Sequence, residues 1–371
     1  MDLFNSKYIL SNKRFGWIDY DRGISIILVT YRHCFEGLER AGIDFKSFPV
    51  FEYINVFFFG FRMPLFFIAS GIFISSSMRK KGYGNYAYNR IQTILYPLLI
   101  WGIIQISLQM LFSDHTNSDV TPDYYWYLLA EPRITGQFWY LNALFFVGII
   151  YATLREFLKF KKMHQLLLGL TMYFFAWYLR EQALNWGFAM DIFKYYMFFA
   201  IGDMISEWIL TEGAAKIFTS WKIVLPLFIS FITIQYFFTE INMKAGDNYH
   251  VENHMPFLFI LVALVGCSIS ICASFSLKKH ASMKFLRVVG YNSVHIYCMQ
   301  VIIMAAARVV LVKAGIIYPP LLLPLVLISG IVFPMIAYNV ALRFNMWWLF
   351  TLKKPVEEIA YLSDKKESNK A

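Results

Sequence analysis

The sequence predicts an all-α, polytopic integral membrane protein with about ten transmembrane helices and both termini in the cytoplasm. Three observations support this fold class: the composition, the recurrence of apolar runs, and the alternation of basic residues between successive connections. Hydrophobic residues make up 58% of the chain, aromatic residues 19% and charged residues 16%, and the mean hydropathy is +0.50. A soluble domain carries about 25% charged residues, so the composition favours a membrane protein.

Apolar runs long enough to cross a bilayer recur from one end of the chain to the other. A transmembrane helix needs about 20 predominantly apolar residues. In chain order the expected spans are 18–35, 54–77, 93–112, 138–154, 165–179, 190–210, 222–239, 256–275, 288–312 and 321–343. We interpret residues 1–355 as one transmembrane domain and residues 356–371 as a short cytoplasmic tail.

Lysine and arginine are distributed unevenly between alternate connections. Six lie in the connections assigned to the outer side: Arg40, Lys46, Arg133, Arg180, Lys244 and Lys313. Five lie within spans or at their ends: Arg22, Arg32, Arg62, Lys194 and Arg308. The other 23 of the 34 lie in the terminal segments and the remaining loops. Cytoplasmic loops carry an excess of basic residues, so both termini are expected in the cytoplasm. The net charge of +10 therefore indicates topology rather than nucleic-acid binding.

The first expected span carries two ionisable side chains, Arg22 and His33, which are eleven residues apart. Eleven residues are close to three helical turns, so both side chains share one face and lie about 16 Å apart along the axis. Asp19, one turn before Arg22, points the same general way. Ionisable residues in a transmembrane helix usually mark a polar pathway or a reactive site. The structural alternatives are a packing histidine, and an anchoring arginine paired to Asp19 or Asp21.

Arg62 is a cation inside the second expected span. Counted from Ile54 at the outer end, it lies about 12 Å deep, at a height comparable to that of His33. An intramembrane cation needs a partner. Arg62 could face a reaction chamber and stabilise a developing oxyanion, or it could form a fixed ion pair with Glu52 or Asp203. We favour the functional interpretation.

The sequence does not indicate a metal site. The cysteines all fall in apolar spans without the paired spacing of a zinc site, so we expect packing residues and no disulfide. These residues are Cys34, Cys267, Cys272 and Cys298. His250 and His254 share a helix face, but no third ligand of the metalloprotease type accompanies them.

Three segments, 18–33, 61–71 and 290–297, together resemble acyltransferase family 3, the membrane-bound acyltransferases that modify bacterial surface glycans. The first is similar to the family's Arg-x10-His pattern, with Asp19 three residues before the arginine. The second is similar to its MPLFF…SG run, and the third to its late G-x-x-S-x-x-I-Y segment. The matches occur in order and on the expected spans, so the resemblance covers most of the chain.

Weaker matches and departures accompany this resemblance. Arg90 with Pro97 resembles the entrance to the family's third span, and Trp139-Tyr140-Leu141 the entrance to the fourth. Many relatives have histidine where this chain has Arg62, and histidine where it has Gln300. Many also carry a second arginine three residues after the first, which this chain lacks after Arg90.

The resemblance implies an acyl-CoA-dependent O-acyltransferase. It would move an acyl group, which we expect to be acetyl, from cytoplasmic acyl-CoA to a hydroxyl of a cell-surface glycan or glycolipid. The expected place is the inner (plasma) membrane of a bacterium. The expected partners are acyl-CoA, a glycan or lipid-linked sugar, and membrane lipid, without nucleic acid or metal.

The resemblance also suggests roles for individual residues. Histidine has an unperturbed pKa of about 6.5, so a neutral His33 can accept the proton of the acceptor hydroxyl. Arg62 is the second catalytic candidate, beside this base. We assign donor binding to Arg22 and Arg90, because a guanidinium binds phosphate bidentately, and to Asp19, which matches the family's pattern beside Arg22. Arg90 could equally be only a topology charge. We assign the acceptor side to Trp139, Tyr140 and Asn142.

Two other function classes are compatible with the same residues. In a transporter or a flippase of a lipid-linked glycan, Arg22 and His33 would line a substrate or proton path. Inverted repeats would favour a transporter, and the sequence shows none. A structural subunit of a glycan-export assembly would have no catalytic role for these residues.

The charge distribution predicts that the C-terminus lies in the cytoplasm. A reporter that is active only in the cytoplasm should therefore be active when fused after Ala371. A reporter that is active only outside the cytoplasm should be inactive at the same position, and the reverse pair of results would refute the assigned orientation.

Overall fold

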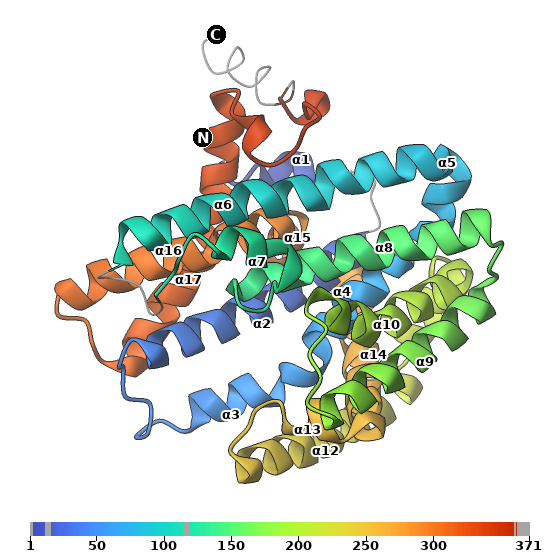
Figure 1. The fold of residues 1–371 in the computed structure, drawn as a ribbon, viewed down its shortest axis with the longest axis horizontal. Coiled ribbons are helices and arrows are strands. Elements are labelled where there is room, and N and C mark those ends of the chain that lie inside the picture. Colours follow the sequence, from blue (N-terminus) through green and yellow to red (C-terminus); the bar gives the residue numbers. More distant parts are fainter. Residues whose placement is uncertain (1–2, 12–15, 114–118, 360, 362–371) are drawn as a thin grey trace. The chain divides into compact units, whose positions relative to one another are not determined.

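A computed structural model describes residues 3–11, 16–113, 119–359 and 361 of the chain. The described residues form helices joined by turns and contain no strand, which confirms the all-α fold class (Figure 1). Within them, seven helical segments are long and apolar enough to cross a membrane. These are Val50–Gly71, Ile74–Leu111, Gly136–Phe157, Trp221–Ala245, Pro256–His280, Ser293–Lys313 and Pro319–Arg343.

The three other expected spans also lie on helices, but these helices are more polar. They are α2 (Gly16–Arg40), α9 (Lys162–Glu181) and α10 (Phe188–Ile209). Charged residues are buried inside two of them, for example Asp21 in α2 and Asp203 in α10. The count of ten spans and the cytoplasmic termini therefore stay predictions.

The chain divides into two compact units. The first unit contains Met1–Asp44, Gln92–Pro122 and Ala281–Ala371, and the second contains Phe45–Ile91 and Asp123–His280. Each unit is thus assembled from segments that are distant in the sequence.

In the first unit, α2 is the helix against which the others are arranged. Its neighbours α15, α16 and α17 all pack against it, α6 packs against α16, and α1 contacts α15. These helices are α1 (Ser6–Ser11), α6 (Tyr96–Leu111), α15 (Lys284–Tyr291), α16 (Ser293–Lys313) and α17 (Pro319–Arg343).

The crossing of α2 and α15 depends on two glycines, Gly23 and Gly290. A Cβ atom on Gly290 would overlap the backbone carbonyl of Asp19 and lie 2.7 Å from the backbone N of Gly23. A Cβ on Gly23 would overlap the backbone carbonyl of Leu286. The two backbones therefore touch without a side chain between them.

The start of the expected tail is hydrogen-bonded to the rest of the first unit. Residues 356–359 form a helical turn, and the Glu358 side chain is buried. Its carboxylate accepts hydrogen bonds from Asn5, Tyr291 and Tyr338. Residue 360 and residues 362–371 of the expected tail lie outside the described part.

In the second unit, α10 packs against α4, α8 and α9, while α14 packs against α4 and α12. The remaining helices are short or lie beside these. They are α3 (Val50–Phe57), α4 (Phe59–Gly71), α5 (Ile74–Arg90), α7 (Tyr124–Ala130), α8 (Trp139–Phe157), α11 (Glu212–Phe218), α12 (Trp221–Ala245), α13 (His250–His254) and α14 (Pro256–His280).

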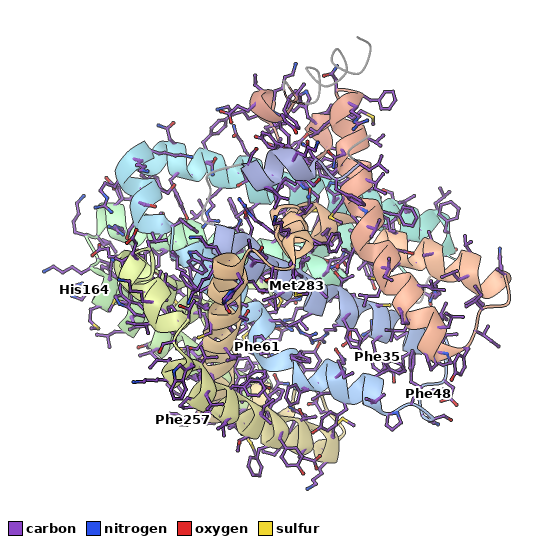
Figure 2. All side chains as sticks on the ribbon, turned by 180° about the vertical axis from the view of Figure 1, so that it is seen from behind. Phe35, Phe48, Phe61, His164, Phe257 and Met283 are labelled. Atoms are coloured by element: carbon purple, nitrogen blue, oxygen red, sulfur yellow. The ribbon has the colours of Figure 1, made fainter. Side chains whose placement is uncertain are left out.

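The second unit contains a glycine crossing of its own, between α4 and α10. A Cβ on Gly71 would lie 3.2 Å from the Cα of Gly202 and would overlap the carbonyl of Phe199. Near the other end of α4 lies the buried Phe61, which is labelled in Figure 2. Its side chain packs against Gly266 of α14 and the Phe231 ring of α12. The MPLFF…SG segment therefore packs on both sides, and its terminal glycine allows the close approach to α10.

The α2–α15 crossing predicts a specific sensitivity to a single methyl group. Gly290→Ala should lower the unfolding temperature of the detergent-solubilised protein, since overpacking costs about 1–3 kcal/mol. Gly37→Ala is the control, because Gly37 is a helical glycine of α2, the partner helix of this crossing, and a Cβ there meets nothing within 4 Å. Equal unfolding temperatures for the two variants would contradict the close crossing.

Candidate functional site

Arg22 and His33 lie on one uninterrupted helix, α2, which spans Gly16–Arg40. Because no break separates them, helical geometry places them on one face, about 16 Å apart. Both side chains are half-buried, unlike the fully buried Asp21 beside Arg22. A side chain that is held by its surroundings yet partly accessible can meet a substrate.

Asp19 connects this helix to α15. Its carboxylate forms an ion pair with Arg287, with 3.5 Å between Oδ2 and Nε, and both side chains are largely buried. The Arg287 guanidinium also donates to the carbonyl of Leu10. From the sequence, Arg287 was interpreted only as a basic residue of a cytoplasmic loop. Nothing in the sequence indicated that it is the partner of Asp19.

Two of the three resembling segments therefore meet within the first unit. Segments 18–33 and 290–297 touch at the Gly23–Gly290 crossing. The adjacent Asp19–Arg287 ion pair also joins α2 to α15. Sequence position alone gives no sign of this, since about 270 residues separate the two segments.

Gln300 of α16 bonds to α2 one turn before His33. The Thr30 hydroxyl, one turn before His33 on α2, donates to Oε1 of Gln300, and both side chains are fully buried. The Nε2 atom of Gln300 has no hydrogen-bond partner among the described residues. The position at which many relatives carry histidine therefore presents an amide donor one turn from His33.

Arg62 belongs to the second unit and is fully buried in α4. Its guanidinium carbon lies 5.0 Å from the centre of the Phe59 ring, which is a cation–π distance. The suggested partner Asp203 is bound instead to Ser75, Tyr151 and Arg155. Among the described ion pairs, none joins Arg62 to Asp203 or to Glu52. The proximity of Arg62 to His33 stays a prediction.

Arg90 ends α5 and is held by aromatic side chains. Its Nε donates to the Tyr86 hydroxyl at 2.8 Å, and the guanidinium lies 5.2 Å from the Tyr86 ring and 5.8 Å from the Phe199 ring. A π-helical turn, Ile91–Leu95, follows directly. Such turns are frequent at functional sites.

The three residues expected on the acceptor side lie together at the start of α8. Trp139 lies beneath the Arg133 guanidinium, 4.4 Å from ring centre to Cζ. Tyr140 packs against the Phe66 and Phe67 rings of α4.

Asn142 has a structural task at this place. Its side chain is fully buried, and Nδ2 donates to the carbonyls of Leu128 and Leu129 at the end of α7. The Asn142 side-chain amide therefore links α8 to the end of α7 through hydrogen bonds.

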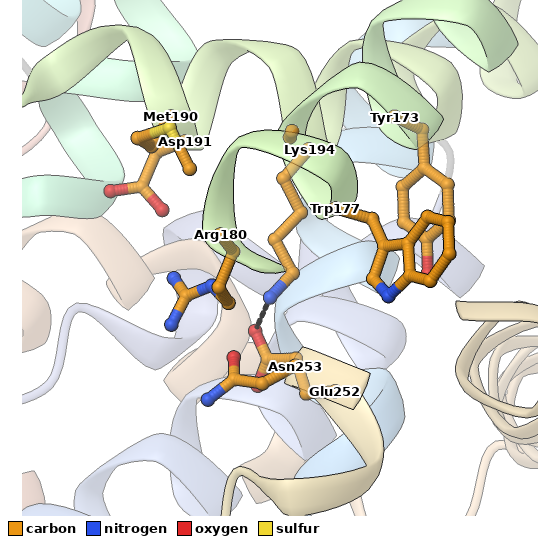
Figure 3. A pocket seen from close by; sticks show the side chains of 9 residues that line it. Tyr173, Trp177, Arg180, Met190, Asp191, Lys194, Glu252 and Asn253 are labelled. Atoms are coloured by element: carbon orange, nitrogen blue, oxygen red, sulfur yellow. Dashed lines mark ion pairs between the residues drawn. The ribbon is translucent and has the colours of Figure 1, made fainter. Parts of the chain in front are cut away.

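The structure also reveals a buried charge cluster that the sequence did not single out. Asp191 accepts two hydrogen bonds of 2.9 Å from Nε of Arg133, and Lys194 forms an ion pair with Glu252 of α13 (Figure 3). The Tyr195 hydroxyl donates to the same Glu252. The available signal was the spacing of Asp191 and Lys194, one turn apart at the beginning of an apolar helix.

No group of three or more His, Cys, Asp or Glu residues in the described ranges could hold a metal ion. The four cysteines are all buried, and none of them forms a disulfide.

Comparison with known proteins identifies the family. The family model described as "Acyltransferase domain" matches residues 15–339, which is most of the chain. Nodulation protein NolL of Mesorhizobium japonicum is 27% identical over 150 residues, which are 40% of this chain and 38% of that protein. The chain thus matches about two fifths of the length of this curated relative. No solved structure matches. Because the family match extends over residues 15–339 and contains all three resembling segments, the chain belongs to acyltransferase family 3.

Proposed function

We propose that this protein is an O-acyltransferase of the bacterial inner membrane. It moves an acyl group, expected to be acetyl, from cytoplasmic acyl-CoA to a hydroxyl of a cell-surface glycan or glycolipid. Residues 1–355 form the acyltransferase domain and 356–371 its cytoplasmic tail. The observation that carries the proposal is the placement of Arg22 and His33 on one continuous helix that is fixed to segment 290–297.

His33 is the general base in this proposal. The neutral imidazole accepts the proton of the acceptor hydroxyl while that oxygen attacks the thioester carbonyl. A carbon–oxygen bond forms, the carbon–sulfur bond breaks, and the proton passes from the imidazolium to the departing CoA thiolate. The products are the acylated acceptor and free CoA.

Developing charge on the thioester oxygen needs a donor or a cation close to it. Nε2 of Gln300 is a candidate, because it lies on α16 at the level of Thr30, one turn from His33. Arg62 is the second candidate, because a buried guanidinium already oriented by Phe59 costs little to reorganise during the reaction.

Arg22 and Arg90 bind the phosphates of the donor. Both are expected near the cytoplasmic ends of their helices, where acyl-CoA arrives, and a planar guanidinium binds phosphate oxygens bidentately. Asp19 supports donor binding indirectly, since its ion pair with Arg287 holds the segment of α2 that carries Arg22. Trp139 and Tyr140 lie on the opposite, acceptor side.

The assignment of His33 predicts a large loss of activity with intact folding. In membrane vesicles supplied with labelled acetyl-CoA, His33→Ala should lower incorporation of label into the glycan fraction by about 10²-fold or more. His280→Ala is the control, because His280 is exposed at the end of α14. Near-parental incorporation by a normally inserted His33→Ala protein would exclude His33 as the base.

The assignment of Arg22 predicts weaker donor binding when the guanidinium fork is lost but the charge is kept. Arg22→Lys should raise the dissociation constant for acetyl-CoA about tenfold, which corresponds to one charge-assisted hydrogen bond. Arg32→Lys is the matched control on the same helix, because Arg32 is engaged by Glu36 at 2.7 Å. If both variants bind acetyl-CoA like the parent protein, Arg22 is a membrane anchor.

A further inference from the structure

A small cavity lies in the second unit, where the end of α9, the start of α10 and α13 meet (Figure 3). It is lined by two aromatic side chains and a concentration of charge. The lining residues that matter here are Tyr173, Trp177, Arg180, Asp191, Lys194 and Glu252. The proposed catalytic roles use none of them.

The charges around this cavity do not balance. Both carboxylates are already neutralised, Asp191 by Arg133 and Glu252 by Lys194. Arg180 forms no ion pair and no side-chain hydrogen bond with any described residue, and its only charged neighbour of opposite sign along the chain, Glu181, is bound to His254. One guanidinium is therefore available at the cavity, and it favours an anionic ligand.

The aromatic side chains add a second requirement. The Tyr173 hydroxyl is fixed to the Pro256 carbonyl at 2.9 Å, and Tyr173 is buried. Trp177, one turn before Arg180, is 37% exposed and presents an aromatic surface at the cavity. An exposed indole beside charged and amide groups suits a ligand with one apolar face and several polar substituents, such as a sugar ring. Asn253 supplies an amide at the same place.

The size of the cavity limits what can enter. Its volume is about 20 Å³, enough for one or two water-sized groups. A carboxylate or part of a phosphate fits this space, whereas a sugar ring must stay outside, against Trp177.

The cavity lies at the end of α9 that is remote from the basic loop. Lys159 and Lys161 precede this helix, and Lys162 at its first turn binds Glu207 at the far end of α10. A 20-residue helix is about 30 Å long, which equals the hydrocarbon thickness of a bilayer. With the predicted orientation of the helices, this end of α9 and the cavity beside it lie at the outer surface.

We propose that this cavity binds the acidic group of the acceptor, a uronate carboxylate or a phosphate, with the sugar ring against Trp177 and the anion at Arg180. This proposal rests on the proposed function, because it assumes that the acceptor is a glycan presented at the outer side. It identifies the acceptor class as an anionic glycan.

The test measures sugar binding to the full-length protein in lipid nanodiscs by saturation-transfer NMR, without acyl-CoA. The probes are methyl glucuronide, glucose 1-phosphate and the neutral methyl glucoside. We expect at least one anionic probe to bind about tenfold more tightly than the glucoside, and Arg180→Gln to remove this preference. A stronger signal from the glucuronide identifies a carboxylate ligand, and a stronger signal from the phosphate identifies a phosphorylated one.

Two further variants make the outcome decisive. Lys244→Gln removes a highly exposed cation on the same expected side and should leave binding unchanged. Trp177→Ala should also weaken the binding of the anionic probes. If Arg180→Gln does not fold, Trp177→Ala serves as the test in its place. Equal binding of neutral and anionic probes, or unaltered binding by a folded Arg180→Gln protein, would overturn the proposal.

The same variants separate this proposal from the proposed function. Persistent acyl transfer without anion-selective binding refutes only the cavity assignment. Anion-selective binding without any acyl transfer refutes only the enzymatic proposal.

Discussion

Each unit depends on a place where two helix backbones touch. In the first unit α2 and α15 meet at Gly23 and Gly290, and in the second α4 and α10 meet at Gly71 and Gly202. Inside a membrane, apolar burial gives helices little reason to associate, so close packing at small residues becomes decisive. Because α2 carries both proposed reactive side chains, its contact with α15 also determines how they are presented.

Buried charges reinforce this arrangement in the second unit, where α10 is held at both ends. Near its start Lys194 binds Glu252, and near its end Asp203 binds Arg155 and Tyr151. Removing one partner of a buried pair typically costs about 3–5 kcal/mol, because the other charge is left uncompensated. The same charges make α10 more polar than the seven apolar segments. Near the start of α10, where both carboxylates are paired, the guanidinium of Arg180 on α9 is the surplus charge.

The sequence predicted the positions of the helices better than it predicted which side chains contact one another. Hydropathy located the helices, since length and apolar content are local properties, and the three resembling segments indicated the family that the comparison confirmed. The sequence did not identify tertiary contacts. Arg287 was interpreted as a topology charge, although it forms an ion pair with Asp19. Asp203 was suggested as an ion-pair partner of Arg62, although it pairs with Arg155. A linear pattern defines a residue's face and depth on a helix, but it does not specify the neighbouring helix.

The activity proposed for this membrane protein is the addition of an acyl group to a surface glycan. Mass spectrometry of surface glycans from otherwise identical bacteria with and without the protein tests it most directly. We expect glycan species heavier by one acyl group only when the protein is present, with the added mass on a hydroxyl of an anionic glycan. Identical glycan masses in the two strains, under conditions in which the protein is produced and inserted, would contradict it.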